Sequence, residues 1–395
     1  MKDKEMMRLI AKETTRQIGV VNLIASENYV SDDVRSALGS VFGNKYAEGY
    51  PGHRYYGGNE VVDEVELLCQ ARALDVFGIT RNDWGVNVQA LSGTPANLAV
   101  YSALVPQGGK IMGMSLMHGG HLSHGHTVSM TGKFWQQVSY GVNHGTEVLD
   151  YEEIRNIAIR EKPHILVAGF TAYSRVVDWA MFRSIADEVG ALLLVDLSHV
   201  AGLVAGGVYP SPFPFADVVT TTTHKTLRGP RGALIFSRRD AREIPERIDR
   251  AVFPGLQGGP HVNQISAIAV ALREASTLAF SKYARMVISN TSTIADELMM
   301  RGWRVVSGGT DSHLFLLDTG LRGLSGNVAS RALEQEGIIV NKNTIPFDTR
   351  TAFDPSGIRI GAAAETTRGA KSEDMLEIAS LIDHILTEAM ASGKR

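Results

Sequence analysis

Lys225 stands at the end of an unusual run of hydroxyl side chains. Thr220–Thr223 and then His224 precede it, and the basic segment Thr-Leu-Arg-Gly-Pro-Arg-Gly follows. A lysine attacks a carbonyl carbon only as the neutral amine, and burial or nearby cations lower its pKa enough for this. An isolated lysine in a threonine-rich loop is usually solvated. The surrounding sequence instead favours a lysine that bonds covalently to a carbonyl group.

A carboxylate and a histidine follow one apolar run. Asp196 comes directly after Ala191–Val195, and His199 lies three residues further on. A carboxylate at the carboxyl end of a strand can meet a protonated ring nitrogen and keep that ring cationic. The alternative is that Asp196 caps the next helix. The pair alone leaves both interpretations open.

Ser92–Asn97, with the sequence Ser-Gly-Thr-Pro-Ala-Asn, joins a strand pattern to a helical pattern. Hydroxyls and backbone N–H groups at the start of a helix form an anion site. An ordinary N-cap with Pro95 in the first turn explains the same residues. The segment therefore predicts either an anion site or a simple helix start.

Four histidines crowd one glycine-rich loop: His118, His121, His124 and His126. They have neither an adjacent cysteine or carboxylate nor the helical spacing of a zinc-protease pair. We therefore predict no metal site here, and expect an imidazole that stacks on a flat ring or packs within the loop. Arg359 stands alone in the apolar segment Gly357–Gly361, where either a substrate carboxylate or a structural salt bridge would pair with it.

The elements that must position these residues alternate between strand and helix. Helical patterns such as Ala180–Val189 separate apolar runs that predict strands at His164–Gly169, Ala191–Val195, Asp217–Thr220 and Ala233–Phe236. This alternation predicts a parallel sheet with helices on both faces, which binds ligands at the carboxyl ends of its strands. The remaining predictions are helices at 1–18, Ile265–Leu298 and 372–390, and strands at Ser312–Leu317 and Gly337–Val340.

The composition is that of a globular protein of more than one domain. The chain has 395 residues, 44% of them hydrophobic, and a formal net charge of -3, which excludes a global attraction to nucleic acid or acidic membranes. Cys69 is the only cysteine, so no disulfide forms within the chain. The first residues have no apolar signal core, and no apolar stretch is long enough for a membrane helix. We therefore expect a cytoplasmic protein.

Taken together, these segments resemble the serine hydroxymethyltransferases, which are fold-type I enzymes dependent on pyridoxal 5'-phosphate. The resemblance covers nearly the whole chain, and its blocks are Leu23–Tyr29, Asn44–Gly58, Ser92–Asn97, Gly119–Gly125, Val195–Val204, Thr220–Gly232, Val252–Pro260 and Gly357–Gly361. The resemblance implies an α/β fold with a mainly parallel seven-stranded sheet and a smaller α+β C-terminal domain. The implied divisions are an N-terminal arm that contacts a second subunit (1–80), a large cofactor-binding domain (81–270) and a small domain (271–395).

The resemblance also implies where the cofactor binds. Lys225 would carry it as a Schiff base, Asp196 would pair with its pyridine nitrogen, and His121 would stack on its ring. The other implied cofactor-binding residues are Ser92, Gly93, Thr94, His199 (beside the phenolic oxygen), Thr222 and His224, with Tyr46, Gly258 and Gly259 from the neighbouring subunit.

The implied reaction is the reversible transfer of the hydroxymethyl group of L-serine to tetrahydrofolate. Arg359 and Ser26 would bind the amino-acid carboxylate, and Glu48, with Tyr56 close by, would handle a proton near the hydroxymethyl group. The positions that match folate-binding residues are Tyr55, Leu116, Gly120, Leu122, Asn343 and Phe353. Because two subunits contribute to each site, the resemblance implies at least a homodimer, with a tetramer also open.

Some residues depart from the family pattern. Ala362 and Ala363 stand where Thr and Pro are expected after Arg359, and Ser198 replaces the usual Ala. Because these changes flank the amino-acid site, two alternatives within the enzyme class stay open: a folate-independent β-hydroxyamino-acid aldolase or transaldolase, and an enzyme for α-methylserine. A non-catalytic relative would have lost Lys225 or Asp196, and both are present.

Overall fold

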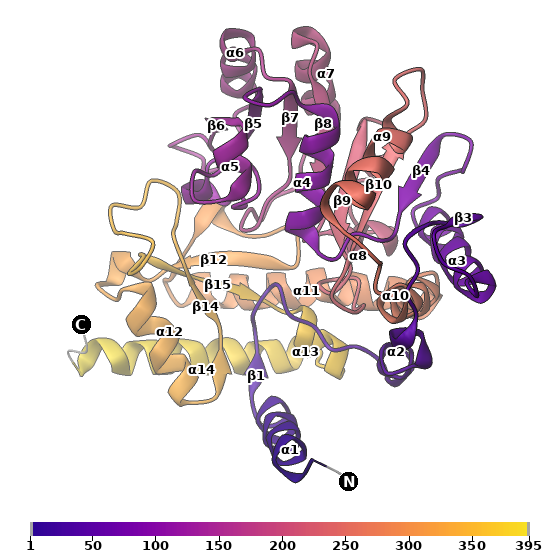
Figure 1. The fold of residues 1–395 in the computed structure, drawn as a ribbon. Helices are drawn as coiled ribbons and strands as arrows, with labels where there is room; N and C mark the ends of the chain where they lie inside the picture. Colours follow the sequence, from indigo (N-terminus) through magenta and orange to yellow (C-terminus); the bar gives the residue numbers. More distant parts are fainter. Residues whose placement is uncertain (1–2, 393–395) are drawn as a thin grey trace.

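A seven-stranded sheet forms the centre of the larger part of the molecule, in the strand order β4-β10-β9-β8-β7-β5-β6 (Figure 1). The computed structural model describes residues 3–392. The strands are β4 (Trp84–Asn87), β5 (Lys110–Met114), β6 (Gln136–Tyr140), β7 (Ile165–Ala168), β8 (Leu192–Asp196), β9 (Val218–Thr222) and β10 (Ala233–Arg238). The four strands predicted from apolar runs in this region are confirmed.

The expectation of a parallel sheet is wrong for one strand. β10 runs antiparallel to both of its neighbours, β9 and β4, whereas the remaining pairs are parallel. A parallel pair needs a crossover of about a dozen residues or more. The 223–232 connection, which carries Lys225, is too short for one and turns the chain straight back, so the sheet is mainly parallel.

Both faces of this sheet are covered by helices, as predicted. Along β7, Leu166 packs into one hydrophobic core and Val167 into another, because neighbouring side chains of a strand point to opposite faces. The helices of this part are α3 (Glu60–Val76), α4 (Gly93–Leu104), α5 (Met130–Phe134), α6 (Tyr151–Glu161), α7 (Trp179–Val189), α8 (Ala201–Ala205), α9 (Ile244–Arg250) and α10 (Val262–Ala275). Five of them, α3, α6, α7, α8 and α10, contribute to the first core, and α4 and α9 to the second.

A smaller four-stranded antiparallel sheet builds the second part of the molecule. Its order is β11 (Arg304–Val305), β12 (Leu314–Asp318), β15 (Gly357–Gly361) and β14 (Asn341–Asn343). Packed with it are α11 (Leu278–Met300), α12 (Gly326–Gln335) and α14 (Ser372–Ala391), the predicted C-terminal helix. The short helix α13 (Ala363–Arg368) follows β15 and contacts α11. The strand expected at Gly337–Val340 is only β13 (Ile338–Ile339), which pairs with β1 (Val21–Asn22) outside this sheet.

The single long helix predicted at Ile265–Leu298 is two helices. Ser276 ends α10, and Thr277 caps α11 by accepting a hydrogen bond from the backbone N–H of Phe280 at 3.3 Å. The first half of α11 packs in the larger core and the second half in the smaller one. In Figure 1, α11 runs horizontally below the large sheet and above α14 of the smaller part.

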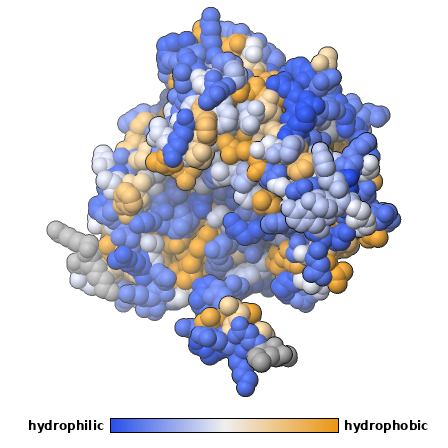
Figure 2. Space-filling model, in the orientation of Figure 1, coloured by the Kyte–Doolittle hydropathy of each residue, from blue (hydrophilic) through white to orange (hydrophobic). Residues whose placement is uncertain are grey.

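Helix α1 (Lys4–Ile18) projects from the body of the molecule, and no residue in it is buried. The helix predicted at 1–18 is thus confirmed over Lys4–Ile18, while residues 1–2 lie outside the described residues. Its apolar face carries the exposed side chains of Met6, Met7, Leu9 and Ile10. Figure 2 shows apolar atoms on this projecting helix. Within residues 3–392, no helix combines the length and the apolar character needed to cross a membrane.

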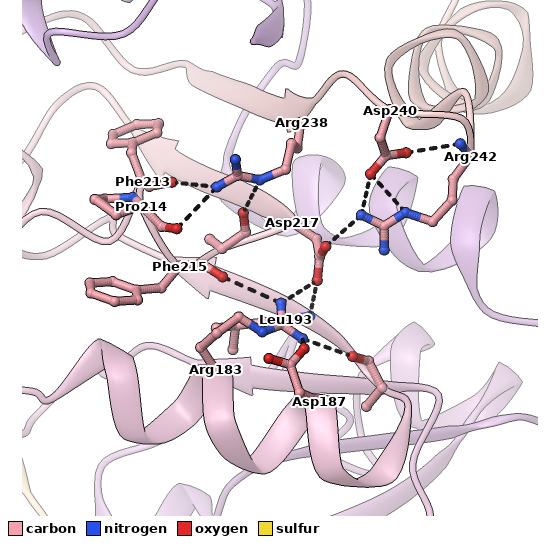
Figure 3. Close-up of polar contacts among 12 residues, drawn as sticks. Arg183, Asp187, Leu193, Phe213, Pro214, Phe215, Asp217, Arg238, Asp240 and Arg242 are labelled. Atoms are coloured by element: carbon pink, nitrogen blue, oxygen red, sulfur yellow. Dashed lines mark hydrogen bonds and ion pairs between the residues drawn. The ribbon is translucent and has the colours of Figure 1, made fainter.

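Arginine side chains surround Asp217 (Figure 3), which lies at the amino end of β9 and so away from the carboxyl ends of the parallel strands. Asp217 directly precedes β9, and its side chain is buried. Its Oδ2 accepts hydrogen bonds from Arg183 Nη1 and from the backbone N–H of Leu193, both at 2.8 Å. Its Oδ1 accepts from Arg242 Nη2 at 2.6 Å. The cluster therefore ties α7, β8 and the loop after β10 together.

Candidate active site

One cavity of about 350 Å³ collects most of the predicted chemistry, and its volume falls in the range of small-molecule sites. Its lining residues are Ser26, Glu27, Ser92, Gly93, Thr94, His121, His124, Phe170, Thr171, Asp196, Ser198, His199, Thr222, His224, Lys225, Arg231 and Arg359. Of the predicted site residues, eleven are in this set. We refer to it below as the lysine cavity.

The carboxyl ends of the parallel strands place these side chains. Asp196 is the last residue of β8, and Thr222 is the last of β9, three residues before Lys225. Thr171 follows β7, and His121 follows β5. Parallel strands bring their carboxyl ends to the same edge of a sheet, so residues far apart in the sequence meet there. Arg359 comes from β15 in the smaller sheet, which closes the cavity from the other side.

Asp196 is held ionised by a ring of donors. Its Oδ2 accepts hydrogen bonds from Asn97 Nδ2 at 2.8 Å and pairs with His124 Nε2 at 3.0 Å, and its Oδ1 accepts from Ser198 Oγ at 2.5 Å. Burial alone would raise the pKa of this carboxyl group, but the hydrogen bond and charge of His124, with smaller contributions from His121 and Ser198, bring the pKa well below its ordinary value. Because Val200, not Asp196, caps α8, the helix-cap interpretation of Asp196 is wrong.

The start of α4 offers free donors to the cavity. Ser92 is the N-cap residue, yet its side chain makes no capping hydrogen bond. The absence of a side chain at Gly93 lets α4 approach β9, because a Cβ there would lie 2.8 Å from Thr222 Cγ2. Among the described residues, the buried Thr222 Oγ1 and His224 Nδ1 have no hydrogen-bond partner. Unpaired polar atoms beside a helix N-terminus are suited to a bound phosphate.

Lys225 lies in the cavity wall, and the pKa of its amine is lowered. Burial, together with the like charges of Arg359 and Arg231, lowers the pKa of Lys225 to about 8, although the negative charge of Asp196 acts to raise it. A useful fraction of the amine is therefore neutral near physiological pH, as bond formation with a carbonyl requires. Its backbone is fixed by Asn28 Nδ2, which donates to the Lys225 carbonyl at 2.9 Å.

Arg359 is a buried cation with no acidic partner among residues 3–392. Its side chain donates to Asn341 Oδ1 at 3.0 Å, to the carbonyl of Thr171 at 2.7 Å and to Ser26 Oγ at 3.4 Å. Only 6% of the residue is exposed, and burial lowers its pKa to about 10. The salt-bridge interpretation of Arg359 is therefore wrong, and a carboxylate from a ligand would complete its pairing.

The four histidines of the glycine-rich loop separate in space. His121 and His124 line the cavity, whereas the ring of His118 packs against the ring of Phe347, with 4.6 Å between the ring centroids. Burial, together with the charges of His124 and Lys225, lowers the pKa of His121 to about 4, so its ring is neutral and suited to stacking. Within the part of the chain that the structure describes, no three side chains of metal-ligand type converge.

The predicted residues outside the lysine cavity form two groups. Tyr46, Glu48, Tyr55 and Tyr56 gather on a surface loop, where Tyr46 Oη donates to Glu48 Oε1 at 3.2 Å and the Tyr46 and Tyr56 rings lie 5.0 Å apart. Gly258 and Gly259 lie against this loop, since Cβ atoms on them would meet Glu48 and Tyr46. The folate positions Leu116, Gly120, Leu122, Asn343 and Phe353 likewise do not line the cavity, and the Phe353 side chain is 86% exposed.

The sequence assigned no role in the site to several residues that line the cavity. They are Glu27, His124, Phe170, Thr171 and Arg231. His124 was visible as one of four clustered histidines, and Arg231 as the second arginine of the segment after Lys225. Phe170 and Thr171 directly follow a strand that the sequence predicted, so their position at its carboxyl end was a usable signal.

Comparisons with known proteins agree with this geometry. The family model described as serine hydroxymethyltransferase matches residues 1–382. A serine hydroxymethyltransferase of Desulfotalea psychrophila is 53% identical, over 97% of this chain and 88% of the relative. One from Acidothermus cellulolyticus is 49% identical over 99% and 90%, and a mitochondrial one from Candida glabrata is 48% identical over 98% and 84%. With this extent of similarity around a buried lysine, an ionised aspartate and an unpaired arginine, the chain belongs to the serine hydroxymethyltransferase family.

Proposed function

We propose that this chain catalyses the reversible transfer of the hydroxymethyl group of L-serine to tetrahydrofolate, which gives glycine and 5,10-methylenetetrahydrofolate. Pyridoxal phosphate is its cofactor, and tetrahydrofolate is its second substrate. The observation that carries the proposal is the position of Arg359. It is a buried cation with no acidic partner among residues 3–392, in the same cavity as Lys225 and Asp196, and it is suited to an amino-acid carboxylate.

The lysine cavity is suited to pyridoxal phosphate at each of its ends. Ser92, Gly93 and Thr94 would bind the phosphate at the start of α4, and Lys225 would bind the cofactor covalently through Nζ. Asp196 would hold the proton on the pyridine nitrogen because its own carboxyl group stays ionised. When bound, pyridoxal phosphate supplies a cationic ring that disperses negative charge from the α-carbon of the amino acid.

The remaining cavity side chains orient the reacting groups. His121 would stack its neutral ring on the pyridine, and Thr222 and His224, which have unpaired polar atoms, would hydrogen-bond the cofactor. His199 would lie beside the phenolic oxygen. Arg359, with the hydroxyl of Ser26, would fix the substrate carboxylate and so set which bond of serine faces the ring.

We propose that a second copy of the chain completes the site. Within one chain, Glu48 and its tyrosine neighbours do not line the lysine cavity, and Tyr46, Tyr55 and Tyr56 are 56%, 74% and 49% exposed. Large exposed aromatic side chains are typical of interfaces. Supplied by the neighbour, Glu48 would move the proton of the substrate hydroxyl with Tyr56 beside it, and Tyr46, Gly258 and Gly259 would contact the phosphate. The unburied apolar face of α1 supports the same dimer.

The folate would bind at the outer side of the cavity. Its binding residues are proposed to be Tyr55, Leu116, Gly120, Leu122, Asn343 and Phe353. Leu122 and Phe353 are exposed apolar side chains, as expected of a wall that is covered only when a flat ring binds. Holding the folate next to the serine hydroxymethyl group would keep the one-carbon unit from escaping into water.

We further propose that the chain divides into an arm (1–80), a large domain (81–270) and a small domain (271–395). Separate hydrophobic cores around the two sheets support this division, with α11 shared between them. The single cysteine, Cys69, is buried and has no partner in the chain for a disulfide, which supports a cytoplasmic location.

The altered residues after Arg359 are poorly placed to change the substrate. Ala362 packs in the smaller core and Ala363 in the larger, and neither lines the lysine cavity. Ser198 does line it, but its hydroxyl is occupied by Asp196. These positions support serine over α-methylserine or an aldolase substrate.

A spectral titration with folate tests the proposed function. Glycine and tetrahydrofolate together should produce a new absorption band at longer wavelength than either produces alone, and serine cleavage should depend on folate. If folate leaves the glycine spectrum unchanged while β-hydroxyamino acids are cleaved without it, the protein is an aldolase. Lys225→Ala should lose the covalently bound cofactor and the turnover. Lys282→Ala, which changes an exposed side chain of α11, should keep both.

A further inference from the structure

Two histidines from different sheets share one hydrogen bond beneath the lysine cavity. His199 Nδ1 lies 3.0 Å from His313 Nε2, and the ring centroids are 5.2 Å apart. The two residues are 6% and 1% exposed. His199 follows β8 in the larger part, and His313 directly precedes β12 in the smaller part. Nothing in the sequence pattern had marked His313.

The groups with the largest effect on the charge of this pair are bases, although the carboxylates of Glu27 and Asp196 line the same cavity as His199. The titratable groups that act on the pair are Lys225, Arg359 and His121, which are cationic or neutral bases. Burial and these charges lower the pKa of His199 well below its ordinary value, and burial, followed by Arg359 and Lys225, lowers the pKa of His313 to about 3. Both rings are therefore neutral near pH 7, and each carries one N–H.

Because both rings are neutral, only one of the two facing nitrogens carries a proton. The donor is therefore either His199 Nδ1 or His313 Nε2. If His199 Nδ1 donates, the proton of His313 lies on Nδ1, a buried atom with no partner among the described residues. If His313 Nε2 donates, its Nδ1 is an unpaired acceptor instead. A buried N–H without a partner is rarer in proteins than an unpaired acceptor, which favours donation by His313.

The other nitrogen of His199 then has a defined role. With Nδ1 accepting from His313, the His199 proton lies on Nε2, and His199 lines the lysine cavity. The backbone of His199 is fixed as well, because Thr226 Oγ1 donates to its carbonyl at 3.0 Å. A neutral donor thus faces the cavity in a set orientation.

We propose that His313 is a positioning residue that fixes the tautomer of His199, so that His199 presents Nε2–H to an anionic oxygen in the lysine cavity. The proposal deepens the function proposed above, since that function places the phenolic oxygen of the cofactor beside His199. A carboxylate at position 313 would draw the proton of His199 to Nδ1 and raise the pKa of its ring, whereas an imidazole orients the ring without charging it. The contact also makes the tautomer depend on how the smaller part packs against the larger.

Three substitutions at one position separate this role from packing. His313→Gln keeps an N–H donor close to the place of Nε2, His313→Leu removes the donor at similar volume, and His313→Glu puts an acceptor there. We expect kcat within about threefold of the wild type for the Gln variant and about a tenfold loss for the Leu variant, the effect of one neutral hydrogen bond, with the KM for serine nearly unchanged in both. In the Glu variant, the pKa of His199 should rise into the range of a normal histidine.

The decisive measurement is the tautomer of His199. Long-range 15N–1H correlation spectra of histidine-labelled holoenzyme report it, and the His199 signal is assigned because it is missing from the spectrum of His199→Asn. The wild type and the Gln variant should show protonated Nε2 and bare Nδ1, and the Glu variant protonated Nδ1. A wild-type His199 protonated on Nδ1 would overturn the proposal, as would Leu and Gln variants with the same tautomer and kcat. The spectra do not depend on turnover, so failure of the proposed reaction would leave this test intact.

Discussion

His124 Nε2 lies 3.0 Å from Asp196 Oδ2, and both side chains are almost completely buried. The contact joins the loop after β5 to the end of β8. It is the largest of the effects that keep Asp196 ionised against the cost of its burial. His124 therefore acts on the cofactor site indirectly, by keeping the carboxylate of Asp196 ionised.

Replacement of His124 should shift the acid side of the pH–activity profile. In His124→Leu, Asp196 keeps its hydrogen bonds from Asn97 and Ser198 but loses the His124 contact, so its pKa rises. Activity should then fall at a higher pH than in the wild type, and kcat at neutral pH should drop about tenfold. The measurement is kcat against pH from about 5 to about 8, the range in which proteins tend to be most stable. His126→Leu, a change in the same loop outside the cavity, should leave the profile unchanged.

Removal of the Arg359 charge should affect binding far more than stability. Arg359→Leu should raise the KM for serine at least about 100-fold, because a bidentate pair with the carboxylate is lost. Since no buried acid among the described residues depends on this cation, the free energy of unfolding should change by no more than about 1 kcal/mol. Denaturant titration and steady-state kinetics measure the two effects. A large loss of stability would instead indicate that Arg359 has a mainly structural role.

Two inactive variants should restore activity when they share a dimer. Lys225→Ala removes the cavity lysine, and Glu48→Gln removes a carboxylate that lies outside its own chain's cavity. In a mixed dimer, one site receives both defects and the other receives none. Unfolding and refolding an equal mixture should therefore recover about a quarter of the wild-type activity, because about half of the dimers are mixed and each has one intact site. No recovery would mean that Glu48 acts within its own chain.

Asp217 should contribute to stability in a pH-dependent way. Burial would raise its pKa, but the hydrogen bonds from Leu193, Arg183 and Arg242 lower it overall. A lowered pKa in the folded state adds stability above the unfolded value of about 4, and this is lost as the pH falls through the folded value. Asp217→Asn should lower the free energy of unfolding by about 2 kcal/mol at pH 7 and by less in acid. The loss at pH 7 is smaller than for a fully buried ion pair because the arginine side chains are partly exposed.

The control for this substitution is Asp187→Asn. Asp187 pairs with the same Arg183 at 2.7 Å, but its side chain is 68% exposed. Its replacement should cost no more than about 0.5 kcal/mol at any pH. Urea titrations of both variants at pH 7 and pH 4 give the comparison, and equal losses would show that burial of Asp217 is not the cause.

The sequence was sufficient for the elements and residues whose signal is local. The apolar runs predicted β7, β8, β9 and β10, and Lys225, Asp196 and Arg359 were selected by their neighbours in the chain. The direction of β10 was not predictable from its composition, because an apolar run has no direction. The break at Ser276 was hidden because apolar periodicity continues on both sides of it.

Partners distant in the sequence were the main omission. His313 and Thr171 matter through contacts with His199 and Arg359, residues more than a hundred positions away. The position of Thr171 after a predicted strand indicated the cavity but not its contact with Arg359, and His313 has no local pattern that distinguishes it from an ordinary polar residue at a strand end. Their roles follow from the packing of the two sheets against each other, which periodicity does not specify.

Helix α11 couples the stability of the two sheets, because it packs in the hydrophobic cores of both. Phe280, Tyr283, Ala284 and Val287 belong to one core, and Ile294, Ala295 and Leu298 on the same rod belong to the other. Loss of either core would expose half of the helix to water and remove the packing that keeps the other half helical. The two parts of the chain should therefore melt as one cooperative unit, and a protease should find no stable half-molecule to release.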